Sequence, residues 1–165
     1  MLIANASTLM GQRAAHKFID HAKQKDGAVA MTIPGWLIRT GIRIATDTDD
    51  SELDEMEGLR DIVKGIKQLR FVLVEDTNDE VPQSAVDKLI RLSIEVDGME
   101  EYVRVRDKDT RVTVMVKQHK DRITNLLILS DDGDELAVVN VKTKISLTEL
   151  EAAAFSFNQE RKAHN

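Results

Sequence analysis

Turn signals recur at a regular interval between residues 101 and 145, and this spacing constrains the fold more than any other feature. Clusters of turn-forming residues occupy positions 107–109, 119–121 and 131–134, and their centres at 108, 120 and 132 are 12 residues apart. The runs between them alternate apolar and polar residues, which is typical of half-buried antiparallel strands. The segment is therefore predicted to form a four-stranded antiparallel meander.

The first hundred residues combine helical and strand patterns. Apolar residues recur at helical spacing in three segments, and two shorter apolar runs end at turn signals. Residues 69–74 are apolar on both faces, as in a central strand. The expected elements are a helix from Ser7 or Thr8 to Lys25, a strand over 28–33, a helix over 51–66, a strand over 69–74 and a helix from Pro82 to Asp97.

Two shorter segments complete the assignment. Residues 36–45 fit a helix and also alternate as a strand does, and a helix is preferred for them. Trp36, the single tryptophan, opens this segment and is expected to be a partly buried packing residue; an exposed recognition residue is the alternative. The sequence Ser146-Leu147-Thr148-Glu149 is a capping box that predicts a C-terminal helix.

Together these elements predict one domain over residues 1–165, with residues 1–7 and 159–165 frayed. No linker or low-complexity segment divides the chain. The fold class is α+β: two layers, with a mainly antiparallel sheet of about six strands that includes the C-terminal meander. The helices are expected to pack mostly on one face of the sheet.

Composition and motifs exclude several classes of function. The net charge of −6 argues against nucleic-acid binding, and no apolar run approaches the roughly 20 residues that span a bilayer. The chain has no cysteine, and His16 and His21 are five residues apart, which does not place them on one helix face. No nucleophile motif or phosphate loop is present. We therefore expect no catalytic residues, no metal and no cofactor.

Two acidic clusters invite a metal interpretation. The run over 47–57 does not match a calcium loop, because Glu52 stands at the glycine position and Gly58 at the bidentate glutamate position. The cluster over 131–134 has the composition of a hairpin turn. We therefore interpret the run over 47–57 as a solvated loop that leads into the first turn of a helix. We interpret the cluster over 131–134 as a turn between two strands.

The meander suggests a candidate partner-binding face. If its valines face the helices, alternation places cationic residues on the opposite, open face. That face would bind an unknown protein or anionic partner, or a second copy of the chain; a solvated sheet face is the alternative. The candidate residues are Tyr102, Arg104, Arg106, Arg111, Lys117, Lys142 and Lys144.

The order of several short patterns resembles a bacterial family, the domain of unknown function 4252. The resemblance covers nearly nine tenths of the chain. It rests on Phe18 with Asp26-Gly27, on Gly65-Ile66-Lys67-Gln68-Leu69-Arg70, on Tyr102-Val103-Arg104-Val105, on Ile123-Thr124-Asn125-Leu126-Leu127-Ile128-Leu129, and on Lys144-Ile145-Ser146-Leu147-Thr148-Glu149-Leu150.

This resemblance implies an exported, often lipid-anchored protein of the cell envelope, with no enzymatic activity attached. The N-terminal residues 1–6 do not look like a signal peptide, and no anchor cysteine is present, so the localisation stays unknown. The leading hypothesis is a non-catalytic, envelope-associated binding module. A small-ligand carrier and a carboxylate-dependent enzyme are the alternatives.

Overall fold

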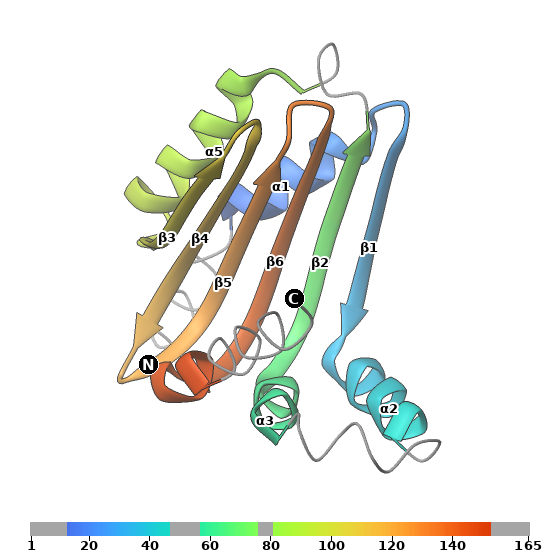
Figure 1. The fold of residues 1–165 in the computed structure, drawn as a ribbon, viewed down its shortest axis with the longest axis vertical. Coiled ribbons are helices and arrows are strands. Elements are labelled where there is room, and N and C mark those ends of the chain that lie inside the picture. The colour runs from blue at the N-terminus through green and yellow to red at the C-terminus, as the bar shows by residue number, and fades with distance from the viewer. Residues whose placement is uncertain (1–12, 47–56, 76–80, 153–165) are drawn as a thin grey trace, which may run out of the picture.

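Six strands form one antiparallel sheet in the order β1-β2-β6-β5-β4-β3 (Figure 1). The computed structural model of the chain describes residues 13–46, 57–75 and 81–152. The strands are β1 Ala28–Pro34, β2 Ile66–Glu75, β3 Glu100–Asp107, β4 Thr110–His119, β5 Arg122–Asp131 and β6 Glu135–Ser146. The helices are α1 Arg13–Ala22, α2 Gly35–Thr46, α3 Glu57–Gly65 and α5 Gln83–Glu95, and residues 147–152 form a further helical segment.

The predicted meander is confirmed as β3 to β6, and each strand pairs with the next. The turns lie where the spacing places them. Lys108 and Lys120 adopt positive φ angles of 51° and 49°, and Gly133 one of 95°. His119 pairs with Arg122 across Lys120 and Asp121, so this hairpin has a two-residue loop, and positive φ at both central residues is the geometry that matches the twist of the strands.

The remaining elements also agree with the sequence patterns. The ambiguous residues 36–45 belong to α2, so the preference for a helix is confirmed. The capping box is present, because the Ser146 N–H donates to the Glu149 carboxylate and the Glu149 N–H donates to the Ser146 hydroxyl. The proposed cap at Ser7 or Thr8, both frayed ends, and the beginning of the helix expected from Ser51 lie outside the described residues.

The connection from β1 to β2 passes through α2 and α3. Gly35 begins α2 against the backbone of β2, and a Cβ atom there would collide with the carbonyl oxygen of Ile66. The Arg39 guanidinium donates to the same carbonyl at 3.1 Å. A glycine is therefore required where the chain turns from β1 into α2 beside the neighbouring strand.

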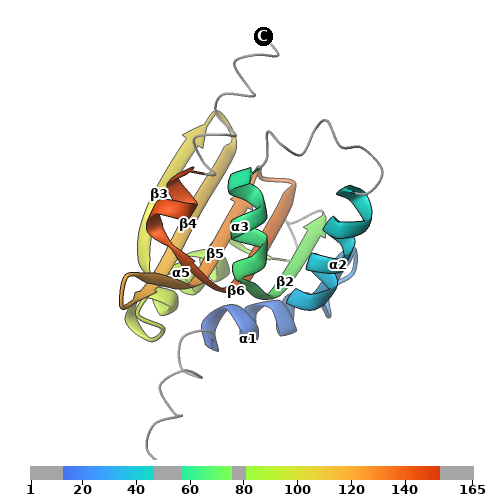
Figure 2. The same cartoon turned by 90° about the horizontal axis from the view of Figure 1, so that it is seen from below.

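Helices α1 and α5 cover one face of the sheet, which we call the helix-covered face (Figure 2). Their apolar stripes, which include Ile19 and Leu89, pack on Val72 of β2 and Val138 of β6. These side chains are buried, and the core continues across β5 and β4 through Leu127 and Met115. The two-layer α+β class and the mainly antiparallel sheet are confirmed.

Within the described ranges, the opposite face is covered by helices only at one end. There α3 and residues 147–152 lie over the lower part of the sheet, on the side away from α1 (Figures 1 and 2). Val116, Ile123 and Ile145 form a second small cluster, against which Ile62 and Leu150 pack. The rest of this face carries no described helix, and we call it the open face.

The expected orientation of the meander is wrong. The helices cover the other side of these strands: Thr113 and Met115 of β4 and Leu136 and Val138 of β6 are buried against α1 and α5. Valines that were expected to face the helices lie on the opposite side instead, and Val105 is 50% exposed. Both faces of these strands are apolar, so alternation alone does not identify the side that carries the helices.

Asp97 fixes α1 to the turn that follows α5. Its carboxylate accepts hydrogen bonds from the backbone N–H groups of Arg13 and Ala14, at 3.3 Å and 3.0 Å. The side chain is 1% exposed, although aspartate is seldom buried. A carboxylate at this position satisfies backbone donors of the first helical turn and interacts favourably with the helix dipole. Asp97 therefore caps a helix that lies more than eighty residues earlier in the chain.

Replacing Asp97 with alanine is expected to lower the free energy of unfolding by about 2 kcal/mol, at the upper end of the range for helix caps, because the backbone donors lose a buried partner. Urea denaturation followed by circular dichroism measures the change. Asp109→Ala, in the exposed turn between β3 and β4, is the matched control and should be close to neutral. Equal stability of the two variants would contradict the role of Asp97.

Candidate functional site

The open face carries an apolar surface that crosses the whole sheet. The registers place Met31, Phe71, Val139, Ile128, Val114 and Val103 in one row, with one residue from each of the six strands. A row on each side continues the pattern. Of the eighteen positions in the three rows, only Ser130 and Glu100 are not apolar.

Exposure is greatest on the two outer strands of the sheet. Val29 and Met31 of β1 are 55% and 51% exposed, and Val103 and Val105 of β3 are also exposed. Most of the central residues are half-buried, because neighbouring side chains shield one another. Val116 and Val141, at the end of the face where Ile62 and Leu150 pack, are buried. The sixteen apolar residues of the open face are Val29, Met31, Ile33, Leu69, Phe71, Leu73, Val103, Val105, Val112, Val114, Val116, Leu126, Ile128, Ala137, Val139 and Val141.

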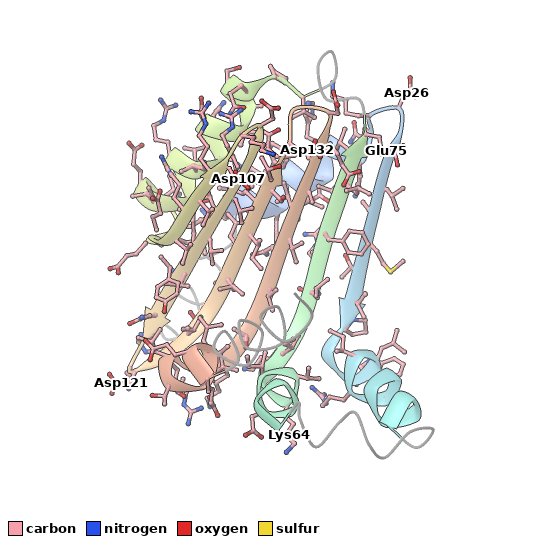
Figure 3. All side chains as sticks on the ribbon, viewed as in Figure 1. Asp26, Lys64, Glu75, Asp107, Asp121 and Asp132 are labelled. Atoms are coloured by element: carbon pink, nitrogen blue, oxygen red, sulfur yellow. The ribbon has the colours of Figure 1, made fainter. Side chains whose placement is uncertain are left out.

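Charged residues lie beyond the ends of these rows. Figure 3 shows Asp26, Glu75, Asp107 and Asp132 at one end of the strands, and Asp121 and Lys64 at the other. Asp132 accepts the N–H groups of Asp134 and Glu135, and these hydrogen bonds lower the pKa of its carboxyl group. The arrangement is an apolar centre between two polar ends, which is typical of a protein-binding surface.

The cationic residues proposed for the open face are placed elsewhere. Arg104 pairs with Thr113 and Arg106 with Arg111, so all three arginines belong to the helix-covered side of β3 and β4. They line a shallow pocket of about 230 Å³ between these strands and α5. Arg111 donates hydrogen bonds to Gln83 of α5 at 2.6 Å and to Asp131 at 3.3 Å. The Arg104 side chain forms an ion pair with the Glu101 carboxylate.

The remaining candidates lie at a different part of the sheet. Lys117 and Lys142 both pair with Asn125, near the opposite end of the strands from Arg111. Lys144 is exposed on the same side of β6 as Lys142, since the intervening Thr143 turns toward α3 and donates to the Gly65 carbonyl. Tyr102, 43% exposed, falls at the register shift of β3. The seven residues therefore do not form one open cationic face.

Two other sequence expectations can be compared with the structure. The cluster over 131–134 forms the expected turn, in which the Asp131 and Asp132 carboxylates accept backbone N–H groups. Most of the acidic run over 47–57 lies outside the described residues. Trp36 is 61% exposed, so the expectation of a partly buried packing residue is wrong.

The described residues form no metal site. Within residues 13–46, 57–75 and 81–152, no three His, Asp or Glu side chains are grouped so that they could hold a metal ion. Over the same ranges, no helix is long and apolar enough to cross a membrane.

His16 of α1 is a half-buried titratable group. Its Nε2 atom is buried without a hydrogen-bond partner among the described residues. Burial is the main cause that lowers the pKa of His16, and Arg70 and Lys142 lower it further, whereas Asp20 and Asp97 raise it. Asp20 forms ion pairs with Lys23 and Arg70, each at 2.9 Å, and these partners hold the pKa of its carboxyl group below its usual value. The fold therefore disfavours protonation of the His16 imidazole relative to the unfolded chain.

The open face was missed by the sequence analysis, although a signal for it exists. Residues 126–129 and 136–139 are continuous apolar runs rather than alternating ones, as are residues 71–74 of β2. Such runs are expected of strands that are covered on both faces. In this sheet they mark strands of which one face carries helices and the other is left open.

This architecture defines a class: an α+β domain with one helix-covered and one open apolar sheet face. The family described as "Domain of unknown function (DUF4252)" matches residues 23–153, so the chain belongs to that family and the resemblance is confirmed. No curated protein and no solved structure gives a significant match.

The free energy of unfolding should decrease as the pH falls from about 8 to about 5.5. In the unfolded chain the pKa of His16 is near 6.5, whereas the fold lowers it, so His16 binds a proton more readily in the unfolded chain. Urea denaturation at each pH measures the effect. His16→Gln should remove this part of the pH dependence, whereas His21→Gln, on the exposed side of α1, should retain it. The assignment fails if both variants keep the full pH dependence.

Proposed function

We propose that this domain is a non-catalytic interaction module, and that its open face binds the open face of a second copy of the chain. The observation that carries the proposal is the row of apolar residues that spans all six strands without a charged side chain. Apolar patches of this extent are uncommon on the free surface of monomeric proteins and mark interaction sites.

The area of the face is sufficient for a stable pair. Neighbouring strands lie about 4.8 Å apart and residues on one face about 6.8 Å apart along a strand, so the three rows cover on the order of 600 Å² in each copy, of which the part around Val116 and Val141 is already buried within the fold. Side-chain relief and the polar ends add to this footprint, and a standard interface buries about 800 Å² per partner. Two twisted sheets pack in this way about 10 Å apart, with their strands at about 30° to one another.

A second copy suits the open face, because in a two-fold interface the same apolar patch serves both partners. The charges at the two ends select no orientation. Asp121 lies with Lys64 at one end of the sheet, and the Lys64 ammonium group is already paired with the Asp61 carboxylate at 3.4 Å.

Substitutions on β3 test the proposal, because adjacent residues there point to opposite faces. Val103→Glu places a charge in the proposed interface, and should weaken self-association by about a hundredfold or more, since burying an unpaired carboxylate is costly. Arg104→Glu, on the helix-covered side, should leave association unchanged. Met31→Glu on β1 should act as Val103→Glu does. Sedimentation velocity over a concentration series measures the dissociation constant.

Both residues are exposed, so the variants should keep the stability of the parent chain within about 0.5 kcal/mol. If the wild-type chain stays monomeric at high micromolar concentration, the open face does not bind a second copy, and the proposal is refuted. If Arg104→Glu weakens association and Val103→Glu does not, the interface lies on the helix-covered face, and the proposal is contradicted.

The absence of catalysis and the envelope location belong to the same proposal. Support for a binding role comes from the apolar open face. The envelope location rests on what the family resemblance implies. Fractionation of cells that express the native gene tests it: recovery of the protein in the envelope fraction is expected, and exclusive recovery in the cytoplasm would contradict it.

A further inference from the structure

A second, independent feature lies on the other side of the sheet. Helices α1 and α5 run side by side there, and an apolar groove of about 380 Å³ lies between them, here called the α1–α5 groove. Its volume is within the range of small-ligand sites. Small side chains leave this space open, because Ala14 and Ala22 of α1 face Ala85 of α5. Phe18 and Leu89 complete the apolar lining.

The charged residues that line the groove are all lysines. They are Lys17 and Lys25 of the α1 side and Lys88 of α5, and no aspartate or glutamate lines it; His21 also belongs to the lining. This is unusual in a chain with a net charge of −6. The groove thus combines an apolar floor with a cationic rim.

The nearest carboxylates on the two helices are engaged elsewhere. Asp20 is turned toward Lys23 and Arg70, and Asp87 accepts a hydrogen bond from Gln83 at 3.1 Å. Lys17 and Lys88 form no ion pair with another described residue. The charges of these two lysines, one on each side of the groove, are therefore not neutralised within the described part of the fold.

We propose that the α1–α5 groove binds a monomeric, single-chain anionic amphiphile, a free medium-chain fatty acid. The hydrocarbon chain lies along Ala22, Ala85 and Leu89, and the carboxylate lies at the rim between Lys17 and Lys88. Charge-assisted hydrogen bonds from lysine select the anion, and burial of methylene groups provides most of the affinity. This site is separate from the open face.

Calorimetric titration of the full chain with decanoate, below its micelle concentration, tests the site. Binding should weaken about threefold for each methylene removed in the shorter acids. Decanol and decyltrimethylammonium should bind at least tenfold more weakly than decanoate. The double variant Lys17→Gln with Lys88→Gln should weaken decanoate binding about tenfold and decanol binding little. Arg91→Gln, also on α5 but outside the groove, is the matched control and should bind as the parent does.

Two further measurements distinguish this site from others. Ala85→Leu fills the groove and should weaken both decanoate and decanol, whereas Val103→Glu on the open face should weaken neither. Loss of decanoate binding in Val103→Glu would move the site to the open face and overturn the proposal. Equal binding of decanol and decanoate, no binding of either, or binding only to phosphatidylglycerol vesicles would overturn it as well.

Discussion

The structure depends on a sheet whose strands are apolar on both faces. Period-two alternation gives each strand two sides, and in β2, β5 and β6 both sides carry Val, Leu, Ile or Phe. A sheet of this kind needs a layer on each face, yet α1 and α5 supply only one. The exposed valines of β3 and the exposed residues of β1 follow directly from this imbalance.

The helix-covered layer depends in turn on few polar contacts. Asp97 attaches the first turn of α1 to the end of α5, and Arg70 with Asp20 attaches the middle of α1 to β2. These contacts set α1 beside α5 at a spacing that the alanines Ala14, Ala22 and Ala85 do not fill. One side of the molecule thus carries a groove with charged margins, and the other a flat uncharged face.

The fold was largely predictable from the sequence, whereas the candidate sites were not. Turn residues at a regular interval determine a meander, because each tight turn forces the next strand to pair with the last. The side that carries the helices is not contained in that pattern. Met115, Leu127 and Leu136 reach the helices with longer side chains, while Val114 and Val139, compact and β-branched, lie on the open face. The α1–α5 groove was unpredictable because it joins residues 14–25 to residues 81–92 through Asp97, and no local pattern indicates that pairing.

The strand order has a consequence for how the chain reaches its fold. All pairings join strands that are consecutive in sequence except that of β2 with β6, which brings residues 66–75 beside residues 135–143. The four strands of the meander can therefore assemble from local contacts, for which loop closure is entropically cheap and fast. The seam between β2 and β6 forms only when the N-terminal half docks on that template. Slow amide exchange along β5, and faster exchange along β1, is the order of local stability that such an assembly produces.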